Sequence, residues 1–105
     1  MDNEKLKILI VDDEPDILEI LKINLENVGY SVYSASNGKK ALKKADLIVP
    51  DLIILDIMMP IMDGIETCQR LRLDERFKET LVIFLTARGE EYSHIAAFES
   101  GADDY

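Results

Sequence analysis

Short apolar runs alternate along the chain with longer segments of helical spacing. Three continuous runs and one alternating run predict strands over Lys7–Val11, Tyr30–Ala35, Leu52–Leu55 and Leu81–Leu85. Apolar residues at three- and four-residue steps predict helices over Pro15–Val28, Lys39–Ala45, Gly64–Arg72 and Glu90–Ser100. This alternation is typical of an α/β domain in which right-handed crossovers join parallel strands.

Residues at the ends of these segments support the same boundaries. Pro15 suits the first turn of a helix, with Asp13 or Glu14 as its cap, and Gly29 is a natural stop. The last residues, 103–105, resemble the start of a further element.

Polar residues stand directly after three of the predicted strands. Asp12 and Asp13 follow the first strand, Asp56 follows the third, and Thr86 follows the fourth. Ligands of open parallel sheets bind beyond the carboxyl ends of the strands, so we expect these side chains to converge. The alternative is that such acids are only helix caps and turn formers, which is our interpretation of Asp63 before Gly64.

Converging carboxylates repel one another, and burial raises their pKa values unless a cation compensates. An all-oxygen set with few protein ligands favours Mg²⁺ over Ca²⁺, and the sequence has no cluster of His and Cys for zinc. A carboxylate beside such an ion can attack phosphorus and form an acyl phosphate, a role that we assign to Asp56. The hydroxyl of Thr86 can donate to a phosphoryl oxygen.

Composition narrows the possibilities further. The length of 105 residues predicts a single domain. The net charge of −9 argues against direct binding of nucleic acid. No apolar run is long enough to span a membrane and no signal peptide is recognisable, so we expect a cytoplasmic protein without membrane contact. The lone cysteine, Cys68, cannot form an internal disulfide and is expected to be half-buried and inert.

Four motifs in order give the chain a family resemblance over essentially its whole length. They are ILIVDDEPD, PDLIILDIMMPIMDG, VIFLTA and GADDY. With these motifs the chain resembles the receiver domain of bacterial response regulators in two-component signalling. The resemblance implies a doubly wound, flavodoxin-like α/β fold of three layers, α/β/α. Its parallel sheet has strand order 2-1-3-4-5, and in this chain the fifth strand and fifth helix are missing or incomplete.

The resemblance also implies residue roles. Asp56 matches the phosphorylation site, Asp13 a direct Mg²⁺ ligand, and Asp12 a ligand acting more through water. The backbone carbonyl of Met58 matches a further metal contact. The hydroxyl and aromatic residues that report phosphorylation correspond to Thr86 and Tyr105. Bordering residues are Pro60, Ala87 and Arg88.

The family pattern continues past Tyr105 with a Lys-Pro pair and a fifth helix, which the 105 residues do not include. We expect residues 1–105 to form one receiver domain at the start of a longer protein, and the later part of the pattern to be cut away, disordered or naturally missing. Without that helix, the third and fourth strands would partly face water and the fourth would be an unprotected edge. We therefore expect a homodimer, formed through the fourth-helix side or this exposed edge.

The leading hypothesis is a phosphorylation-dependent switch. A sensor histidine kinase or phosphotransfer protein would phosphorylate Asp56 with Mg²⁺, and a downstream effector could regulate transcription. One alternative is a pseudo-receiver that binds partners without phosphate, favoured by the missing lysine. Another is an aspartyl-nucleophile phosphohydrolase, which usually has a second acid two residues after the nucleophile, where this chain has Met58. We therefore do not expect a turnover enzyme.

Overall fold

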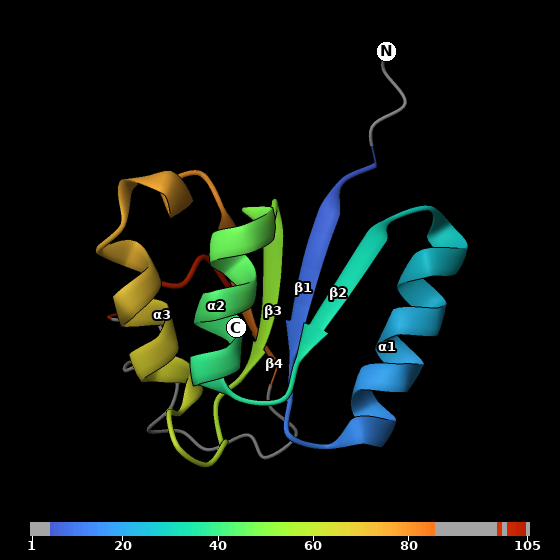
Figure 1. Ribbon diagram of the computed structural model, residues 1–105, viewed down its shortest axis with the longest axis horizontal. Helices are drawn as coiled ribbons and strands as arrows, with labels where there is room; N and C mark the ends of the chain where they lie inside the picture. The colour runs from blue at the N-terminus through green and yellow to red at the C-terminus, as the bar shows by residue number, and fades with distance from the viewer. Residues whose placement is uncertain (1–4, 86–98, 100, 105) are drawn as a thin grey trace.

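A four-stranded parallel sheet forms the centre of the computed structural model, which describes residues 5–85, 99 and 101–104. Its strands are β1 (Lys7–Val11), β2 (Ser31–Ala35), β3 (Leu52–Asp56) and β4 (Leu81–Leu85), in the order β2-β1-β3-β4 (Figure 1). The order and the parallel pairing confirm the flavodoxin-like fold class. Strand β2 begins one residue later than predicted, after Tyr30, and β3 ends one residue later than predicted, at Asp56.

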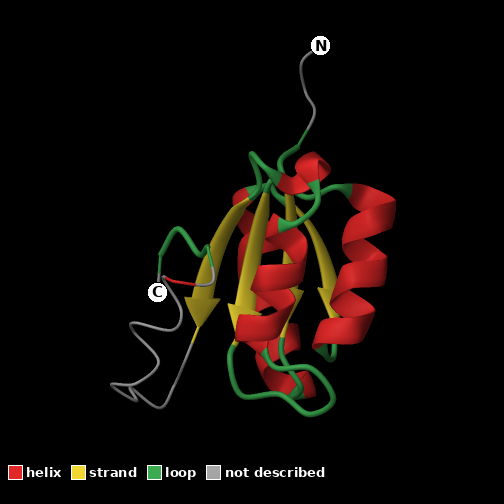
Figure 2. Cartoon of the chain, turned by 90° about the vertical axis from the view of Figure 1, so that its left-hand side faces the viewer, coloured by secondary structure: helices red, strands yellow, loops and turns green. Residues whose placement is uncertain are grey.

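Helices cover both faces of this sheet, as Figures 1 and 2 show. Helix α1 (Pro15–Val28) packs on one face, and α2 (Gly38–Ile48) and α3 (Gly64–Arg72) pack on the other. The bounds of α1 and α3 are those predicted from the sequence. A short 3₁₀ helix, η1 (Glu75–Phe77), was not predicted, and α2 extends beyond the predicted Lys39–Ala45 at both ends.

The ends of the helices follow local chemistry. Glu14 is the N-cap of α1, one of the two predicted candidates, although its side chain makes no capping bond. Gly29 ends this helix in the left-handed region at φ 116°. The side chain of Asn37 caps α2 by accepting the N–H of Lys40 at 2.8 Å, so the helix begins at once after Asn37.

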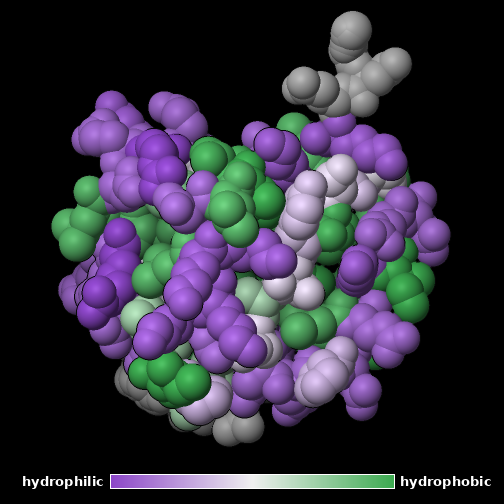
Figure 3. All heavy atoms as spheres, in the orientation of Figure 1, coloured by the Kyte–Doolittle hydropathy of each residue, from purple (hydrophilic) through white to green (hydrophobic). Residues whose placement is uncertain are grey.

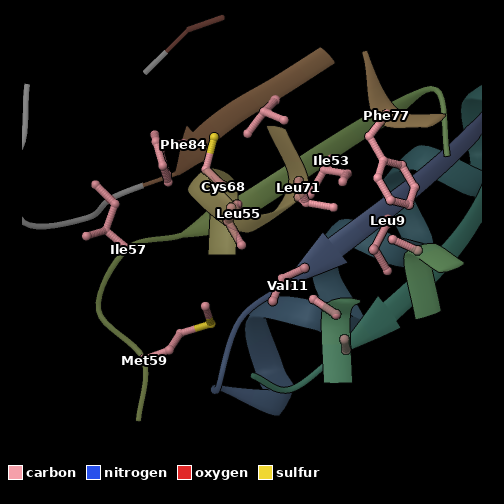
Figure 4. Close-up of a cluster of buried hydrophobic side chains, with 14 residues drawn as sticks. Leu9, Val11, Ile53, Leu55, Ile57, Met59, Cys68, Leu71, Phe77 and Phe84 are labelled. Carbon is pink, nitrogen blue, oxygen red and sulfur yellow. The ribbon is translucent and has the colours of Figure 1, made fainter. Parts of the chain in front are cut away.

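The apolar core divides between the two faces of the sheet. On the α1 side, the smaller cluster centres on Ile8, Ile10 and Val32. The larger cluster lies under α2 and α3, and Figure 4 shows its side chains from β1, β3, α3 and the loop after β3. Cys68 belongs to this cluster and is fully buried, so the expectation of a half-buried side chain was wrong. The cause is that α3 turns this residue toward the sheet.

Residues 101–104 return to the sheet beside β4. Asp104 forms a parallel bridge with Ile83, and its carbonyl accepts the N–H of Phe84 at 3.1 Å. The predicted further element therefore starts at this position, as expected for a fifth strand. It also corrects the expectation of an unprotected fourth strand, because this short segment pairs with the outer edge of β4.

Some apolar side chains on the α1 side remain in contact with water. Leu81 and Leu85 on β4 are 53% and 38% exposed, and Ile20 and Ile23 on α1 are about as exposed as Leu81. The expectation that strand side chains on this face partly meet solvent is thus confirmed for β4.

Several predictions lie outside the described residues. They concern the helix Glu90–Ser100 and the individual residues Thr86, Ala87, Arg88 and Tyr105. Within the part of the chain that the structure describes, no helix has both the length and the apolar character needed to cross a bilayer.

Candidate metal and phosphoryl site

The strand register brings the first and third strands' acids together. Val11 pairs with Leu55 across the β1–β3 ladder, so the next residues, Asp12 and Asp56, emerge side by side at the carboxyl edge. Asp13 follows in the loop that leads to α1. One carboxylate oxygen from each of these three residues lies within 4.8 Å of the others. In Figure 1 all strand arrows point to this edge.

Asp12 is the most buried member of the group, at 7% exposure. Its N–H donates to the carbonyl of Ala35 at 3.2 Å, and its Oδ1 accepts the N–H of Glu14 at 2.9 Å. Burial raises the pKa of Asp12, the bond from Glu14 lowers it, and the nearby charges of Asp13 and Glu14 raise it again. The net direction is upward, so the folded chain disfavours the charged form of this carboxyl.

Asp56 carries the largest perturbation in the site. Burial, followed by the charge of Asp12, raises the pKa of Asp56 from 3.8 to about 6, with a smaller rise from Asp13. The backbone N–H groups of Met58 and Ile57 oppose the rise by donating to this carboxylate. The side chain nevertheless remains partly exposed at the rim. A carboxylate held here at neutral pH is therefore accessible and destabilised by its neighbours.

The loop after β3 is fixed by a glycine that packs against the Asp56 backbone. Gly64 donates its N–H to the carbonyl of Ile57 at 2.9 Å. A Cβ added at Gly64 would lie 2.2 Å from the carbonyl oxygen of Asp56 and 2.9 Å from the Cα of Ile57. No side chain fits this space, so the start of α3 can approach the site only with glycine at this position.

The predicted cap at the same turn is present. Asp63 accepts the N–H of Glu66 at 2.8 Å, which confirms the interpretation of Asp63 as a helix cap rather than a ligand. Pro60 lies exposed in the loop, and its carbonyl accepts the N–H of Met62 at 2.7 Å. The Met58 side chain is 46% exposed.

The end of β4 lies beside the acidic group. Asp56 pairs with Leu85 across the β3–β4 ladder, so the chain leaves β4 next to the candidate acceptor. Thr86 is the following residue in the sequence and lies outside the described residues, as do Ala87, Arg88 and Tyr105. The structure thus brings together Asp12, Asp13 and Asp56.

The donor set suits a hard divalent cation. All three groups are carboxylates, and they form the one such cluster of His, Cys, Asp or Glu found among the described residues. Mutual repulsion and partial burial raise the free energy of the metal-free site, and a bound cation would offset both effects. Few protein ligands at a partly exposed rim fit Mg²⁺, which retains several waters.

The roles of two residues at opposite ends of α3, the first beside the site and the second away from it, were not anticipated from the sequence. Gly64 was interpreted only as a turn residue, whereas its role is the absence of a Cβ next to Asp56. Arg72, at the end of α3, donates to the carbonyl of Gly101 at 2.9 Å and to the carboxylate of Asp103 at 2.7 Å. Asp103 also accepts the N–H of Val82 at 2.9 Å. The spacing of residues along the sequence gives no indication of the contact of Gly64 with Asp56 or of the bonds of Arg72 to residues 101 and 103.

Comparisons with known proteins agree with this geometry. The family model described as "Response regulator receiver domain" matches residues 8–105. Among curated relatives, the chain is 50% identical to the alkaline phosphatase synthesis transcriptional regulatory protein PhoP of Bacillus subtilis, over 94% of the chain and 40% of the relative. It is also 50% identical to the DNA-binding dual master transcriptional regulator RpaA of Synechocystis, over 94% and 41% respectively. The chain thus spans about two fifths of the length of these relatives.

Solved structures give the same result. A putative response regulator from Chloroflexus aurantiacus superposes with a TM-score of 0.91 at 37% identity, covering 97% of this chain and 84% of that one. The chemotaxis protein CheY4 of Vibrio cholerae superposes with a TM-score of 0.92 at 32% identity, covering 96% and 84%.

Proposed function

The chain belongs to the response-regulator receiver domains, and from this premise we propose that Asp56 is its phosphoryl acceptor. The observation that carries the proposal is the convergence of Asp56 with Asp12 and Asp13 at the carboxyl edge of the sheet, with one oxygen of each within 4.8 Å of the others. A surface acid without a role needs no such neighbours. Two neighbouring carboxylates raise the free energy of the folded chain by repulsion unless they bind a cation that takes part in phosphoryl transfer.

The three carboxylates would hold Mg²⁺, with the backbone carbonyl of Met58 as a fourth protein ligand. When bound, the ion neutralises negative charge as a phosphoryl group approaches. Asp13 is the exposed member of the set and the more accessible ligand, whereas the buried Asp12 suits contact through water.

Asp56 supplies the nucleophile. An oxygen of its carboxylate attacks the phosphorus of the donor, the bond from phosphorus to the donor's leaving atom breaks, and an acyl phosphate forms. The backbone N–H groups of Met58 and Ile57 orient the carboxylate. The rigid contact of Gly64 with the Asp56 backbone holds the strand end in place during transfer.

The switch would lie beside this site. Asp56 pairs with Leu85, so Thr86 is the next residue after the strand position that faces the acceptor. We assign Thr86 the hydroxyl that donates to the phosphoryl group and Tyr105 the aromatic residue that changes position with it. The assigned rim residues are Pro60, Ala87 and Arg88.

The donor is a sensor histidine kinase or a phosphotransfer protein, and the domain is a phosphorylated switch in the cytoplasm rather than a turnover enzyme. The relatives PhoP and RpaA are transcriptional regulators, and we propose that the whole protein likewise regulates transcription through a further domain. The net charge of −9 argues against nucleic-acid contact by this segment itself. The exposed Leu81 and Leu85 support a homodimer formed through the face of the sheet on which α1 packs.

Incubation with Mg²⁺ and acetyl phosphate tests the acceptor. We expect intact-mass spectrometry to detect one added phosphoryl group on the chain, absent in Asp56→Asn and retained in the matched control Asp16→Asn. Asp16 is an exposed acid in the first turn of α1. Steady phosphate release without an adduct would indicate a hydrolase. A chain that binds Mg²⁺ yet forms no adduct with acetyl phosphate or a phosphorylated kinase would indicate a pseudo-receiver.

A further inference from the structure

A groove on the outer side of β2, the end strand of the sheet, is lined by none of the three acidic residues of the site. It has a volume of about 430 Å³ and is lined by Leu18, Ser34, Ala35, Ser36, Lys40, Lys43, Lys44 and Leu47. This volume lies within the range of about 300–1,000 Å³ typical of ligand sites. Nothing in the phosphorylation chemistry uses these residues, so the groove requires its own explanation.

The lining shows that the groove wraps around the open edge of β2. Val32 packs with the α1-side cluster and Ala35 with the α2-side cluster, so Ser34 lies on the α1 side by alternation. The groove therefore includes side chains from both faces of the sheet. Since β2 is the end strand in the order β2-β1-β3-β4, its outer edge is the boundary between these faces.

The outer edge of β2, to which Ser34 of the groove belongs, pairs with no further strand in the part of the chain that the structure describes. Ser31 donates its N–H to the carbonyl of Leu6 at 2.9 Å, and the carbonyl of Ala35 accepts from Asp12, so these alternate residues turn toward β1. By the two-residue repeat of a strand, Val32 and Ser34 turn their N–H and C=O groups outward. Such an edge is a template for pairing with another extended segment.

Positive charge lines one wall of the groove. Helix α2 carries four of the 12 basic residues of a chain with 21 acids, and three of them, Lys40, Lys43 and Lys44, face the groove. None of these three takes part in a salt bridge among the described residues. Figure 3 shows the hydrophilic side chains gathered over α2. The charge of this wall is thus available to an external anionic group.

Two leucines add apolar contacts beside the serines of the groove. Leu47, on the same helix, is 80% exposed, and Leu18 contributes from α1 on the opposite side of the sheet. Two acids, Asp16 and Glu19, lie within two residues of Leu18 in the sequence and disfavour further negative charge on the α1 side. The two walls therefore differ: the α2 wall attracts carboxylates, and the α1 wall accepts apolar side chains.

We propose that this groove binds an extended acidic peptide segment of a partner protein, which adds as a strand to the open edge of β2. Successive side chains of a strand point to opposite faces. In the bound segment, alternate Asp or Glu residues would meet the lysines of α2, while the apolar residues between them would contact Leu18. Main-chain bonds to Val32 and Ser34 would supply affinity, and the side-chain alternation would supply specificity. The proposal does not depend on phosphorylation of Asp56.

Binding of a short blocked peptide that alternates Glu and Val tests the proposal on the whole chain. The readouts are an isothermal titration at low salt and amide hydrogen exchange by NMR. We expect saturable binding that weakens with salt and new protection at the outward amides of Val32 and Ser34. A peptide of the same composition with its Glu residues grouped together should bind at least tenfold more weakly.

Variants separate the lysine wall from net charge. Combined Lys40→Glu, Lys43→Glu and Lys44→Glu should weaken peptide binding at least tenfold. A matched triple change at exposed lysines outside the groove, Lys22, Lys39 and Lys78, should leave it within about twofold. Lys40 lies in the first turn of α2, where an acidic residue is favourable, and neither Lys43 nor Lys44 is buried, so the first variant is expected to fold, which circular dichroism would confirm.

A second variant tests strand addition itself. Ser34→Pro removes an outward N–H that the fold does not use, and proline is tolerated on strand edges. It should abolish the binding and the protection of Val32 while the chain remains folded. Three results would each overturn the proposal. They are an equal loss of peptide binding in both triple lysine variants, protection of amides elsewhere than on β2, and tighter binding of a single-stranded oligonucleotide than of the peptide. An absence of binding at low salt would also overturn it.

Discussion

Replacing Asp56 by asparagine should make the metal-free protein more stable at neutral pH. The folded chain holds the pKa of this carboxyl at about 6, above its ordinary value of 3.8, because of burial and the charge of Asp12. Asparagine has nearly the same shape but carries no charge, and its side-chain oxygen can still accept a backbone N–H. The substitution therefore removes the electrostatic cost and keeps most of the packing.

The size of the gain follows from proton linkage. A rise of the pKa from 3.8 to about 6 corresponds to about 3 kcal/mol of unfavourable free energy once the carboxyl is charged in both states. Asp56 is partly exposed, and solvent screening reduces this to about 1–2 kcal/mol. Domains of this size have about 5–15 kcal/mol of total stability, so the change is measurable.

The pH dependence has a defined sign. Below pH 3.8 both the folded and unfolded chains hold the proton, and Asp56 has no effect on their balance. Between 3.8 and about 6 the unfolded chain releases the proton first, so the free energy of unfolding decreases as pH rises, and above 6 it stays reduced. The advantage of Asp56→Asn should therefore grow over this interval and then remain constant.

Urea denaturation in EDTA at about pH 4, 6 and 8 would measure this difference, with Asp16→Asn as the matched control. Added Mg²⁺ should stabilise the natural chain more than the Asp56→Asn variant and so reduce the difference in their free energies of unfolding. A variant that is less stable than the natural chain at pH 8, or a gap that is the same at all three pH values, would refute the electrostatic reasoning.

Further predictions concern the contacts made at the two ends of α3. Gly64→Ala should lower the free energy of unfolding by about 3 kcal/mol or more and reduce Mg²⁺ binding, because the new Cβ would lie 2.2 Å from the carbonyl oxygen of Asp56. Urea denaturation and Mg²⁺ titration would measure both effects, and an unchanged chain would contradict the close packing. Arg72→Met should cost about 2–4 kcal/mol and speed amide exchange at Asp103, since the guanidinium bonds backbone carbonyls and this carboxylate. Arg70→Met removes an exposed ion pair with much less effect, and equal losses in the two variants would refute the role of Arg72.

Much of the fold was predictable because its signals are local. The apolar runs of β1 and β4 and the spacing of α1 and α3 fixed those elements, and Pro15 and Gly29 set the ends of α1. The longer α2 was missed at both ends. Its N-terminus is set by the side-chain cap of Asn37, and it continues to Ile48 before a left-handed Val49 at φ 45° ends it. Strong periodicity predicts the middle of a helix better than its ends.

The acidic cluster was also predictable, because parallel strands bring the residues after their carboxyl ends to one edge. Asp12 and Asp56 lie side by side because each follows or ends one of two adjacent strands, β1 and β3. The contact of Gly64 with Asp56 and the bonds of Arg72 to residues 101–103 could not be predicted. They depend on how closely α3 approaches the sheet, which follows from tertiary packing rather than from spacing along the chain.

The central claim is that the carboxylate of residue 56 accepts the phosphoryl group. Treatment with Mg²⁺ and acetyl phosphate followed by borohydride reduces an acyl phosphate to the alcohol, which converts the acceptor aspartate to homoserine. Peptide mapping by mass spectrometry then locates the modified residue. The account predicts homoserine at position 56 and nowhere else. Homoserine at position 12 or 13, or none in a chain shown to bind Mg²⁺, would contradict it.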